Sequence, residues 1–182
     1  MDNLKKNFGK RKIPEKTKTT LVQSVFSRVS NQYDLMNDIM SLGTHRLWKK
    51  KLIDIMQIQN NDTILDMGSG TGDLVDLILK KNLNSYIYAV DLNLKMLNIN
   101  KKRFSKKQKN KIKFLNANAE DLPIENNFVD KYVISFCLRN ITYIELALKE
   151  AERILKPGGI FYCLEFSMPS TNIVNSIYSK YK

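Results

Sequence analysis

A glycine-rich turn is the segment of this sequence best suited to binding a ligand. It spans Asp66–Asp73, reads DMGSGTGD, and lies between a short apolar run at 63–66 and a helical pattern at 73–80. Glycines let the backbone turn sharply and approach a ligand closely, and the start of the following helix offers unpaired N–H groups. The turn therefore predicts a ligand site at the carboxyl end of a strand, where open α/β sheets bind their ligands.

The spacing of the glycines indicates which ligand this is. Gly68, Gly70 and Gly72 form a G-x-G-x-G pattern, and Asp73 stands where a dinucleotide-binding G-x-G-x-x-G turn has its third glycine. An acid beside the start of a helix repels a pyrophosphate. S-adenosylmethionine carries an ammonium and a sulfonium and no phosphate, so the turn favours it over a nicotinamide cofactor. We expect Asp66 and Asp73 to face its methionine part.

Two later segments could hold the rest of such a cofactor. Asp91 ends the second expected strand, and an acid in this position accepts hydrogen bonds from ribose hydroxyls. Asn118 and Ala119 follow the third expected strand, so Asn118 could bond the edge of an adenine while Ala119 leaves room for the ring. The alternative for this segment is an ordinary polar turn closed by Pro123.

The elements that must position these residues alternate along the chain. Five apolar strands are predicted, at Thr63–Asp66, Tyr86–Asp91, Ile112–Leu115, Tyr132–Phe136 and Ile160–Phe166. Amphipathic helices are predicted at Val22–Val29, Arg46–Met56, Asp73–Lys80, Leu94–Phe104 and Ile144–Leu155, the last of which is ended by Pro157 and Gly158. This pattern predicts the α/β class, with a doubly wound, mostly parallel, Rossmann-like sheet covered by helices on both faces.

The composition limits the function classes. The 182 residues are 43% apolar, which is enough for one packed core. The formal net charge of +12 invites a nucleic-acid or anionic-membrane partner, but 24 of the 30 basic residues are lysines, and proteins that read base edges favour arginine. Cys137 and Cys163 lie in apolar runs, so we expect buried thiols in a reducing compartment. Two cysteines build neither a disulfide framework nor a Cys-rich zinc site, and we expect no metal.

Three segments are expected along the chain. Residues 1–20 form a basic, flexible lead-in that lacks the apolar region of a secretory signal, 21–58 form a helical cap over the substrate cleft, and 59–182 form the cofactor-binding core. Residues 172–182 resemble the start of another amphipathic helix, so we expect a chain truncated before the last strands of the sheet. The alternative is a short natural variant. No segment approaches the ~20 apolar residues of a membrane span.

Together these segments resemble a class I S-adenosylmethionine-dependent methyltransferase. Residues 33–48, YDLMNDIMSLGTHRLW, resemble the N-terminal signature of the UbiE-like ubiquinone/menaquinone biosynthesis C-methyltransferases. Residues 153–167, RILKPGGIFYCLEFS, resemble the second signature of this family. Residues 134–140, ISFCLRN, resemble its segment after the fourth strand, except that Cys137 stands where glycine is usual. The similarity covers nearly the whole chain from about Phe8.

The resemblance implies transfer of a methyl group from S-adenosylmethionine to a ring carbon of a polyprenylated quinol. The implied substrates are 2-polyprenyl-6-methoxy-1,4-benzoquinol, demethylmenaquinol, or both. Because the sulfonium is already a good leaving group, the protein mainly positions and desolvates the reactants and promotes ionisation of the quinol hydroxyl. By motif match, the cofactor contacts are Thr71, Asp91, Asn118, Ala119 and Ser135, and the turn is shaped by Asp66, Gly68, Gly70 and Gly72.

The same resemblance suggests residues for the reaction zone. Arg139 and its neighbour Asn140 follow the fourth strand, and we expect Arg139 to stabilise the phenolate or orient a water on it. The alternative for Arg139 is an ion pair with a helix acid such as Glu145 or Glu150. His45, the only histidine, is a candidate base, and the alternative is a hydrogen-bonded anchor in the cap. The expected substrate-pocket residues in the cap are Tyr33, Asp34 and Asn37.

Other functions stay open at this point. A nucleic-acid or other small-molecule methyltransferase could share the fold, although residues 135–140 lack the Asn/Asp-Pro-Pro-Tyr/Phe loop that holds a flipped base, which disfavours nucleic acid. A truncated chain could also bind cofactor without turnover. The basic run 101–109 suggests attraction to an anionic membrane. We therefore expect a cytoplasmic protein, peripheral at the inner face of the membrane, with other quinone-biosynthesis enzymes as further partners.

Overall fold

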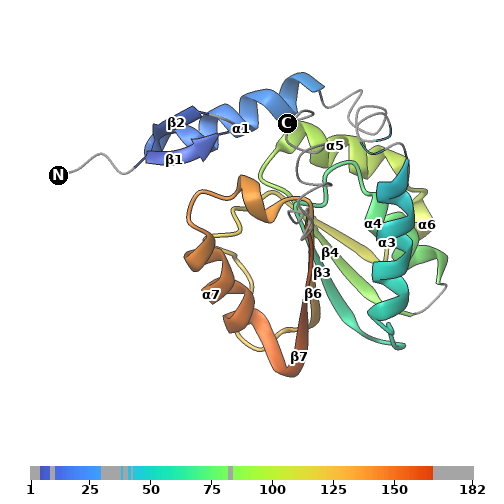
Figure 1. Ribbon diagram of the computed structural model, residues 1–182. Helices are drawn as coiled ribbons and strands as arrows, with labels where there is room; N and C mark the ends of the chain where they lie inside the picture. Colours follow the sequence, from blue (N-terminus) through green and yellow to red (C-terminus); the bar gives the residue numbers. More distant parts are fainter. Residues whose placement is uncertain are drawn as a thin grey trace, which may run out of the picture.

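The computed structural model describes residues 5–8, 11–29, 38, 41, 43–81 and 84–165, and its centre is one parallel sheet (Figure 1). The sheet has five strands in the order β5-β4-β3-β6-β7, and every neighbouring pair is parallel. The strands are β3 (Thr63–Met67), β4 (Tyr86–Val90), β5 (Ile112–Leu115), β6 (Val129–Ser135) and β7 (Leu155–Leu164). The order changes direction between β3 and β6, so the topological switch point, where open sheets bind ligands, lies at the carboxyl ends of these two strands.

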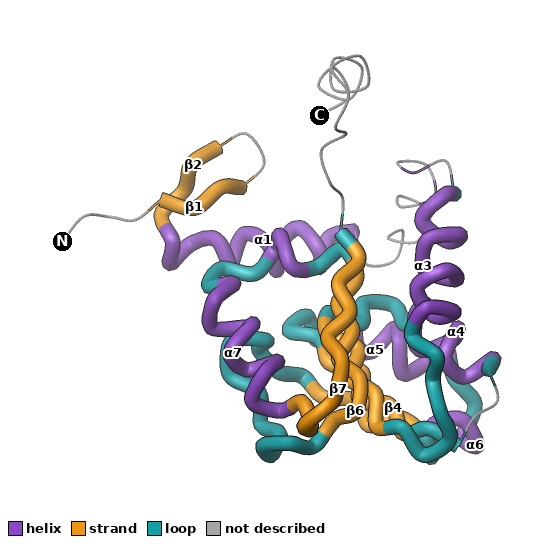
Figure 2. The backbone as a smooth tube through the Cα atoms, turned by 60° about the horizontal axis from the view of Figure 1, so that its bottom comes forward, coloured by secondary structure: helices purple, strands orange, loops and turns teal. Residues whose placement is uncertain are grey.

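Helices cover both faces of the sheet, as the alternating pattern predicts (Figure 2). Apolar residues of α3 (Thr44–Ile55) and α4 (Asp73–Lys80) pack with Ile64 and Val133 on one face. Those of α7 (Ile144–Ile154) pack with Leu65 and Ile134 on the other. Neighbouring strand residues therefore point to opposite faces, and both faces are buried, which is why the strands have near-continuous apolar sequences. The remaining helices are α1 (Glu15–Val29), α5 (Leu94–Arg103), α6 (Lys106–Lys109) and the 3₁₀ turn η2 (Leu138–Asn140).

Each predicted strand and helix of the core has a counterpart in the structure, and the largest difference among the strands lies at the last one. This strand was expected to begin at Ile160, but β7 begins at Leu155, directly after α7, and includes Pro157 and Gly158. Gly158 has a φ of 81°, and the pairing register of β6 with β7 shifts between Val129 and Lys131. The first residues of β7 are therefore irregularly paired, and this irregularity accommodates the Pro-Gly sequence. The Pro-Gly sequence follows the end of α7, as expected, but it belongs to β7 and does not form a loop between the two elements.

The N-terminal segment also differs from the expected flexible lead-in. Strands β1 (Lys5–Phe8) and β2 (Arg11–Pro14) form an antiparallel hairpin, with Lys5 opposite Pro14, and α1 begins at Glu15. Each strand has four residues. Strands this short have too few residues to show a clear alternation of polar and apolar side chains. The basic composition of the segment therefore led to the expectation of a flexible lead-in. The division of the chain into segments 1–20, 21–58 and 59–182 stays a prediction.

Helix α1 is fastened across the carboxyl ends of the strands by buried polar groups (Figures 1 and 2). The buried Lys18 donates from Nζ to the carbonyl oxygen of Ile141, just beyond η2, at 2.7 Å, and to that of Arg139, within η2, at 3.2 Å. At the α5 side, Nδ2 of Asn93 donates to the carbonyl oxygen of Gln23 at 3.1 Å and to Oγ of Ser27 at 2.9 Å. The helix therefore covers the switch point and is held from both sides of it.

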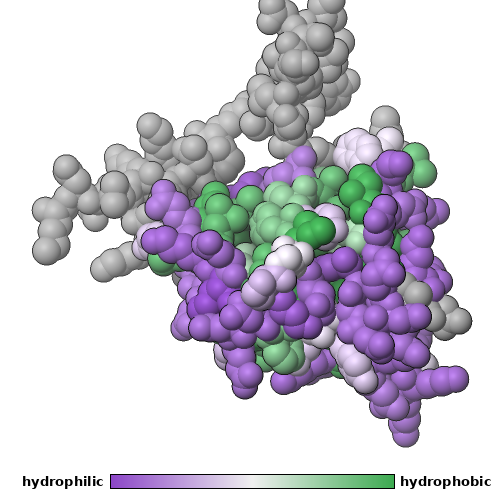
Figure 3. All heavy atoms as spheres, turned by 90° about the horizontal axis from the view of Figure 1, so that it is seen from below, coloured by the Kyte–Doolittle hydropathy of each residue, from purple (hydrophilic) through white to green (hydrophobic). Residues whose placement is uncertain are grey.

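The expectation of two buried thiols is wrong for Cys163 and holds only in part for Cys137. Cys163 is exposed on β7, and Cys137 is half-buried. Strand β7 pairs with β6 alone among the described strands, so its outer side has less cover than the central strands. Figure 3 shows apolar side chains gathered between polar ones on the underside of the molecule, and the exposed apolar residues of α7 and β7 include Leu148 and Ile160. The expected helix at 172–182 lies outside the described residues.

None of the helices in the described part of the chain is both long enough and apolar enough to span a bilayer.

The docking of α1 can be tested at Asn93. Its Oδ1 caps α5 by accepting from the N–H groups of Lys95 and Met96, while its Nδ2 holds α1. Asn93→Ala loses both sets of bonds and is expected to lower the free energy of unfolding by about 1–2 kcal/mol in urea. Asn93→Asp keeps the cap but lacks the donor, so amide hydrogen exchange in α1 should accelerate while the sheet stays protected. Wild-type protection of α1 in Asn93→Asp would contradict this account.

Candidate active site

Two adjoining cavities lie at the switch point beneath α1. The larger is lined by α1 and by residues after β4 and β5, including Asp91, Asn118 and Ala119. The smaller is lined by the glycine turn and by α3, including Asp66, Thr71 and Lys49. Four residues line both cavities, namely Gly68, Gly70, Ser135 and Phe136. The cavities therefore meet between the glycine turn and the end of β6.

The glycine turn is packed so closely that side chains have no room at two of its positions. Gly68 has a φ of 69°, and a Cβ there would collide with the side chain of Cys137. Gly72 has a φ of 93°, and a Cβ there would collide with the side-chain amide of Asn100. Positive φ and the lack of space both require glycine at these positions. The turn can thus bring its backbone close to a ligand on one side while packing on β6 and α5 on the other.

Asp66 is a buried carboxyl group in the smaller cavity without a full set of partners. It is 1% exposed, and its Oδ2 has no hydrogen-bond partner among the described residues. Burial raises the pKa of Asp66 to about 7, and the nearby charge of Lys49 only partly opposes this effect. An unpaired buried acceptor costs free energy. Oδ2 of Asp66 can therefore bind a proton or accept a hydrogen bond from a cationic donor.

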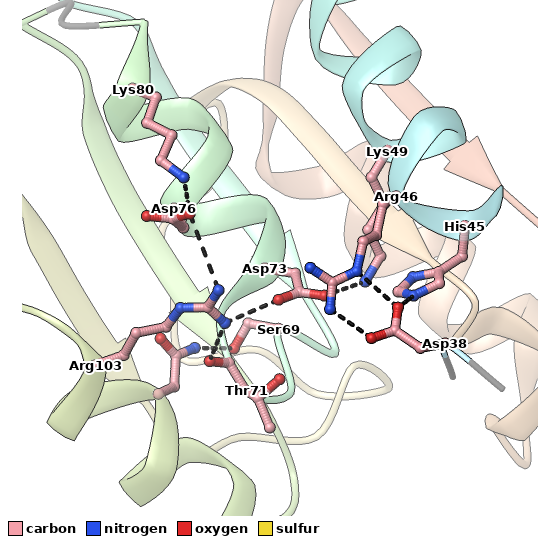
Figure 4. A network of polar contacts seen from close by, with 11 residues as sticks. Asp38, His45, Arg46, Lys49, Ser69, Thr71, Asp73, Asp76, Lys80 and Arg103 are labelled. Carbon is pink, nitrogen blue, oxygen red and sulfur yellow. Dashed lines mark hydrogen bonds and ion pairs between the residues drawn. The ribbon is translucent and has the colours of Figure 1, made fainter. Parts of the chain in front are cut away.

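A network of charges joins the cap helix α3 to the turn (Figure 4). Lys49 is buried and donates from Nζ to Oδ2 of Asp73 at 2.9 Å. Arg103 of α5 donates to Oδ1 of Asp73 at 2.8 Å and to the carbonyl oxygen of Thr71 at 3.3 Å. Burial alone would raise the pKa of Asp73, but Lys49 and Arg103 outweigh it and lower that pKa. Asp73 lines the smaller cavity, so its predicted position facing a cofactor stays open, and its carboxylate is already paired with two cations of the protein.

Asp91 and Asn118 frame the larger cavity. Oδ2 of Asp91 accepts from the N–H of Gly70 at 2.8 Å, and Oδ1 accepts from the N–H of Asn93 at 2.7 Å. Burial raises the pKa of Asp91, and these two backbone donors oppose the rise. Asn118 accepts from the N–H of Glu120 at 3.2 Å through its Oδ1, so its side chain has a fixed orientation. A carboxylate has about four acceptor positions, so Asp91 retains capacity for further donors.

The structure brings most of the predicted cofactor residues together. Those that line one or both cavities are Asp66, Gly68, Gly70, Thr71, Asp91, Asn118, Ala119 and Ser135. Gly72 lies at the start of α4 and shapes the turn from outside the cavity lining. The predicted substrate residue Asn140 lines the larger cavity. Tyr33, Asp34 and Asn37 lie outside the described residues.

Arg139 has a different partner from the one expected. Its backbone N–H donates to Oε2 of Glu165 at 3.0 Å, and its guanidinium pairs with Oε1 of the same carboxylate. Glu150 instead pairs with Arg153. The alternative that Arg139 pairs with a helix acid such as Glu145 or Glu150 is therefore wrong, because the pairing of β6 with β7 places Glu165 beside η2. Arg139 is not among the residues that line the cavities, although it lies next to Asn140, which is.

His45 has the geometry of an anchor. It is 2% exposed, and its Nε2 lies 2.9 Å from Oδ1 of Asp38. Asp38 also accepts two hydrogen bonds from Arg46, and its pKa falls to about 2, first because of Arg46 and then because of His45. His45 points to Asp38 (Figure 4) and is not among the residues that line the two cavities. This placement favours the anchoring role over that of a base.

Sequence reasoning missed Lys49 and Phe136. Lys49 is buried although lysine is rarely so, and its only sequence signal is its position on the side of α3 that carries Ile53 and Met56. Phe136 was assigned to the end of a strand, and the strand ends one residue earlier. Neither position carries a local pattern that predicts contact with the glycine turn.

Comparison with solved structures identifies the class of fold. A methyltransferase dependent on S-adenosylmethionine from Aquifex aeolicus matches with a TM-score of 0.61 and 20% identity, covering 68% of this chain and 66% of that chain. The [4+2]-cyclase SpnF matches with a TM-score of 0.69 and 19% identity, covering 83% and 63%. The fold is that of the class I methyltransferases, and the cyclase shows that the fold alone does not fix the reaction.

Sequence comparison then identifies the family. The model of the ubiE/COQ5 methyltransferase family matches residues 14–182. The ubiquinone/menaquinone biosynthesis C-methyltransferase UbiE of Rickettsia prowazekii (strain Madrid E) is 46% identical in an alignment of 181 positions that covers 96% of this chain and 72% of the relative. The UbiE protein of Zymomonas mobilis is 41% identical over 177 residues, which is 97% of this chain and 72% of the relative. The chain belongs to the ubiE/COQ5 methyltransferase family.

The burial of Asp66 makes a prediction about stability. Its pKa is about 7 in the folded protein against 3.8 for the ordinary carboxyl group, so the folded state holds a proton that the unfolded state releases. The free energy of unfolding should therefore fall as pH rises from about 4 to about 7, by at most about 1.4 kcal/mol per pH unit for this group. Asp66→Asn should remove most of this loss, as measured by urea unfolding at pH 5 to 8.

A matched control is Asp54→Asn. The pKa of Asp54 is lowered, first by its hydrogen bond from Lys81, so it does not titrate in this window. The control should therefore keep the pH dependence of the wild type. A pH dependence in Asp66→Asn equal to that of the wild type would contradict the assignment.

Proposed function

We propose that this chain transfers the methyl group of S-adenosylmethionine to a ring carbon of a polyprenylated quinol in ubiquinone or menaquinone biosynthesis. The proposal rests on the two joined cavities at the switch point of a chain from the ubiE/COQ5 family. The smaller cavity is lined by Asp66, whose carboxyl group has an oxygen without a partner among the described residues. The larger cavity is lined by Asp91, whose carboxyl group accepts hydrogen bonds from two backbone N–H groups. The relatives that match nearly the whole chain are named as C-methyltransferases of this biosynthesis.

S-adenosylmethionine fits the groups that line the cavities. Asp66 offers an unpaired Oδ2 to its ammonium, and Lys49 offers a cation to its carboxylate. Asp91 has acceptor capacity for the ribose hydroxyls, and Asn118 and Ala119 border the space for the adenine. The buried hydroxyl of Ser135 has no partner among the described residues and lies where the cavities meet. Because Gly68 has no side chain, its backbone can line the place where the two cavities meet.

When bound, S-adenosylmethionine supplies an electrophilic methyl group: the S–CH₃ bond breaks with its electron pair left on sulfur, a C–C bond forms to the quinol ring, and the ring carbon loses its proton to solvent or a base. The chain's own residues position the two reactants and exclude water, because α1 lines the larger cavity and α3 lines the smaller one. Arg139 places a positive charge at the carboxyl end of β6, where it would stabilise the phenolate form of the quinol. Its pairing with Glu165 fixes the guanidinium there.

The role of Arg139 can be tested by substitution. Arg139→Ala is expected to lower kcat about 100-fold or more, since a lost oxyanion partner costs this much in other active sites. The affinity for S-adenosylmethionine, measured by calorimetry, should stay near the wild-type value. Arg139→Lys keeps the charge and should retain part of the rate. The assay follows transfer of a labelled methyl group to a short-chain quinol under reducing conditions.

Three outcomes would contradict parts of the proposal. Full turnover in Arg139→Ala with unchanged cofactor affinity would exclude the role given to Arg139. Methylation of RNA but not of the quinol by the wild type would overturn the proposed substrate class. Cofactor binding without any turnover would favour a chain that binds but does not catalyse.

We also propose peripheral contact with an anionic membrane at the inner face, since the substrate's prenyl tail dissolves in the bilayer. Exposed lysines gather on α5 and α6, including Lys102, Lys106 and Lys107. A basic residue near an anionic surface contributes about 1 kcal/mol. A wider assembly with other quinone-biosynthesis enzymes would use the same membrane.

Vesicle binding tests the membrane proposal. The joint substitution of Lys106→Ala and Lys107→Ala should weaken binding to vesicles containing phosphatidylglycerol about thirtyfold at low salt. The matched control, Lys80→Ala with Lys149→Ala, removes the same charge from α4 and α7 and should have a smaller effect. The readout is cosedimentation, with pure phosphatidylcholine vesicles for comparison. Equal binding to both vesicle types would contradict the proposal.

A further inference from the structure

Phe136 has a backbone conformation that large side chains rarely adopt. Its φ is 54°, in the left-handed region, where a bulky residue is an outlier. The residue follows the end of β6, and its N–H donates to the carbonyl oxygen of Leu164 on β7 at 2.7 Å. The sheet therefore holds this conformation in place. Strain of this kind persists where the surrounding structure imposes it, and it often accompanies a functional position.

The strained backbone places Phe136 where the two cavities meet. It is one of the four residues that line both of them. Under the proposed function, the larger cavity takes the adenosine part of S-adenosylmethionine and the smaller takes the amino-acid part. The sulfur atom joins these two parts in the molecule, so it must lie where the cavities join. With the cofactor bound in this way, its positively charged sulfonium would lie beside Phe136.

Among the residues that the structure describes, no carboxylate lines both cavities to balance that positive charge. Asp66 lines only the smaller cavity, and Asp91 lines only the larger one. The residues shared by the two cavities are the uncharged Gly68, Gly70, Ser135 and Phe136. Of these, the aromatic ring is the group that attracts a cation through its π face.

The ring already has a cation near it in this structure. The guanidinium carbon of Arg139 lies over the ring, 6.0 Å from its centroid. Trp48 of α3 contacts the same ring, with centroids 6.3 Å apart and planes inclined by 54°. The cap helix and the turn after β6 thus fix the ring from two directions, so its orientation is set before any ligand arrives.

We propose that the ring of Phe136 recognises the sulfonium of S-adenosylmethionine and thereby distinguishes the cofactor from its neutral thioether product. This inference rests on the proposed function, because it needs S-adenosylmethionine in the joined cavities. The attraction exists only while sulfur is charged. Methyl transfer removes the charge, so the ring favours the cofactor over S-adenosylhomocysteine and promotes release of that product.

Calorimetric titration with three ligands tests the proposal without measuring turnover. S-adenosylmethionine carries a sulfonium, sinefungin carries an ammonium in its place, and S-adenosylhomocysteine is neutral there. Phe136→Leu should weaken binding of the two cationic ligands roughly threefold to thirtyfold, the range of a cation–π contact, and leave the neutral ligand nearly unchanged. The control Phe128→Leu removes a ring that packs on Tyr88 instead, and it should not change the ratio of affinities.

A second set of variants preserves the shape of the ring. Phenylalanine at 136 is replaced by analogues with one, two and three ring fluorines, which weaken the negative π face stepwise. The affinity for S-adenosylmethionine should fall with each fluorine, and that for S-adenosylhomocysteine should not. Equal losses for both ligands, or no loss, would overturn the role of Phe136. Failure of the wild type to bind any of the three ligands would instead overturn the proposed function, and this inference with it.

Discussion

Three carboxylates meet around one glycine turn, and the rest of the site follows from how each one is satisfied. Asp91 accepts two backbone N–H groups, and Asp73 pairs with Lys49 and Arg103. Asp66 keeps an oxygen without a partner among the described residues. Leaving a buried acceptor unpaired costs free energy, so a fold selected for stability alone would have paired it. The site is thus complete only when a ligand supplies the missing donor.

The same charges attach the cap to the sheet. Lys49 brings α3 to the turn through Asp73, while Lys18 and Asn93 bring α1 to the carboxyl ends of the strands. These contacts are directional hydrogen bonds from buried side chains, so they fix where the helices lie as well as how strongly they are held. The cap therefore encloses the cofactor cavities and adds the ring of Trp48 to the support of Phe136.

The sequence predicted those features that depend on local patterns. The alternating apolar segments gave the sheet and its helices, and the glycine spacing gave the ligand turn, because both are properties of neighbouring residues. The alternative ion pair of Arg139 with a helix acid was wrong, because the pairing of β6 with β7 brings Glu165 to Arg139 instead. The burial of Lys49 and the left-handed backbone of Phe136 depend on packing between distant segments, which no local pattern encodes.

The most direct test of this account is the number of protons released when S-adenosylmethionine binds. Titrations at pH 6 in buffers of different ionisation enthalpy measure this number. Asp66 is mostly protonated at pH 6, since its pKa is about 7, and a bound ammonium should displace its proton. The account predicts release of nearly one proton per ligand in the wild type and almost none in Asp66→Asn. Tight binding without proton release in the wild type would contradict it.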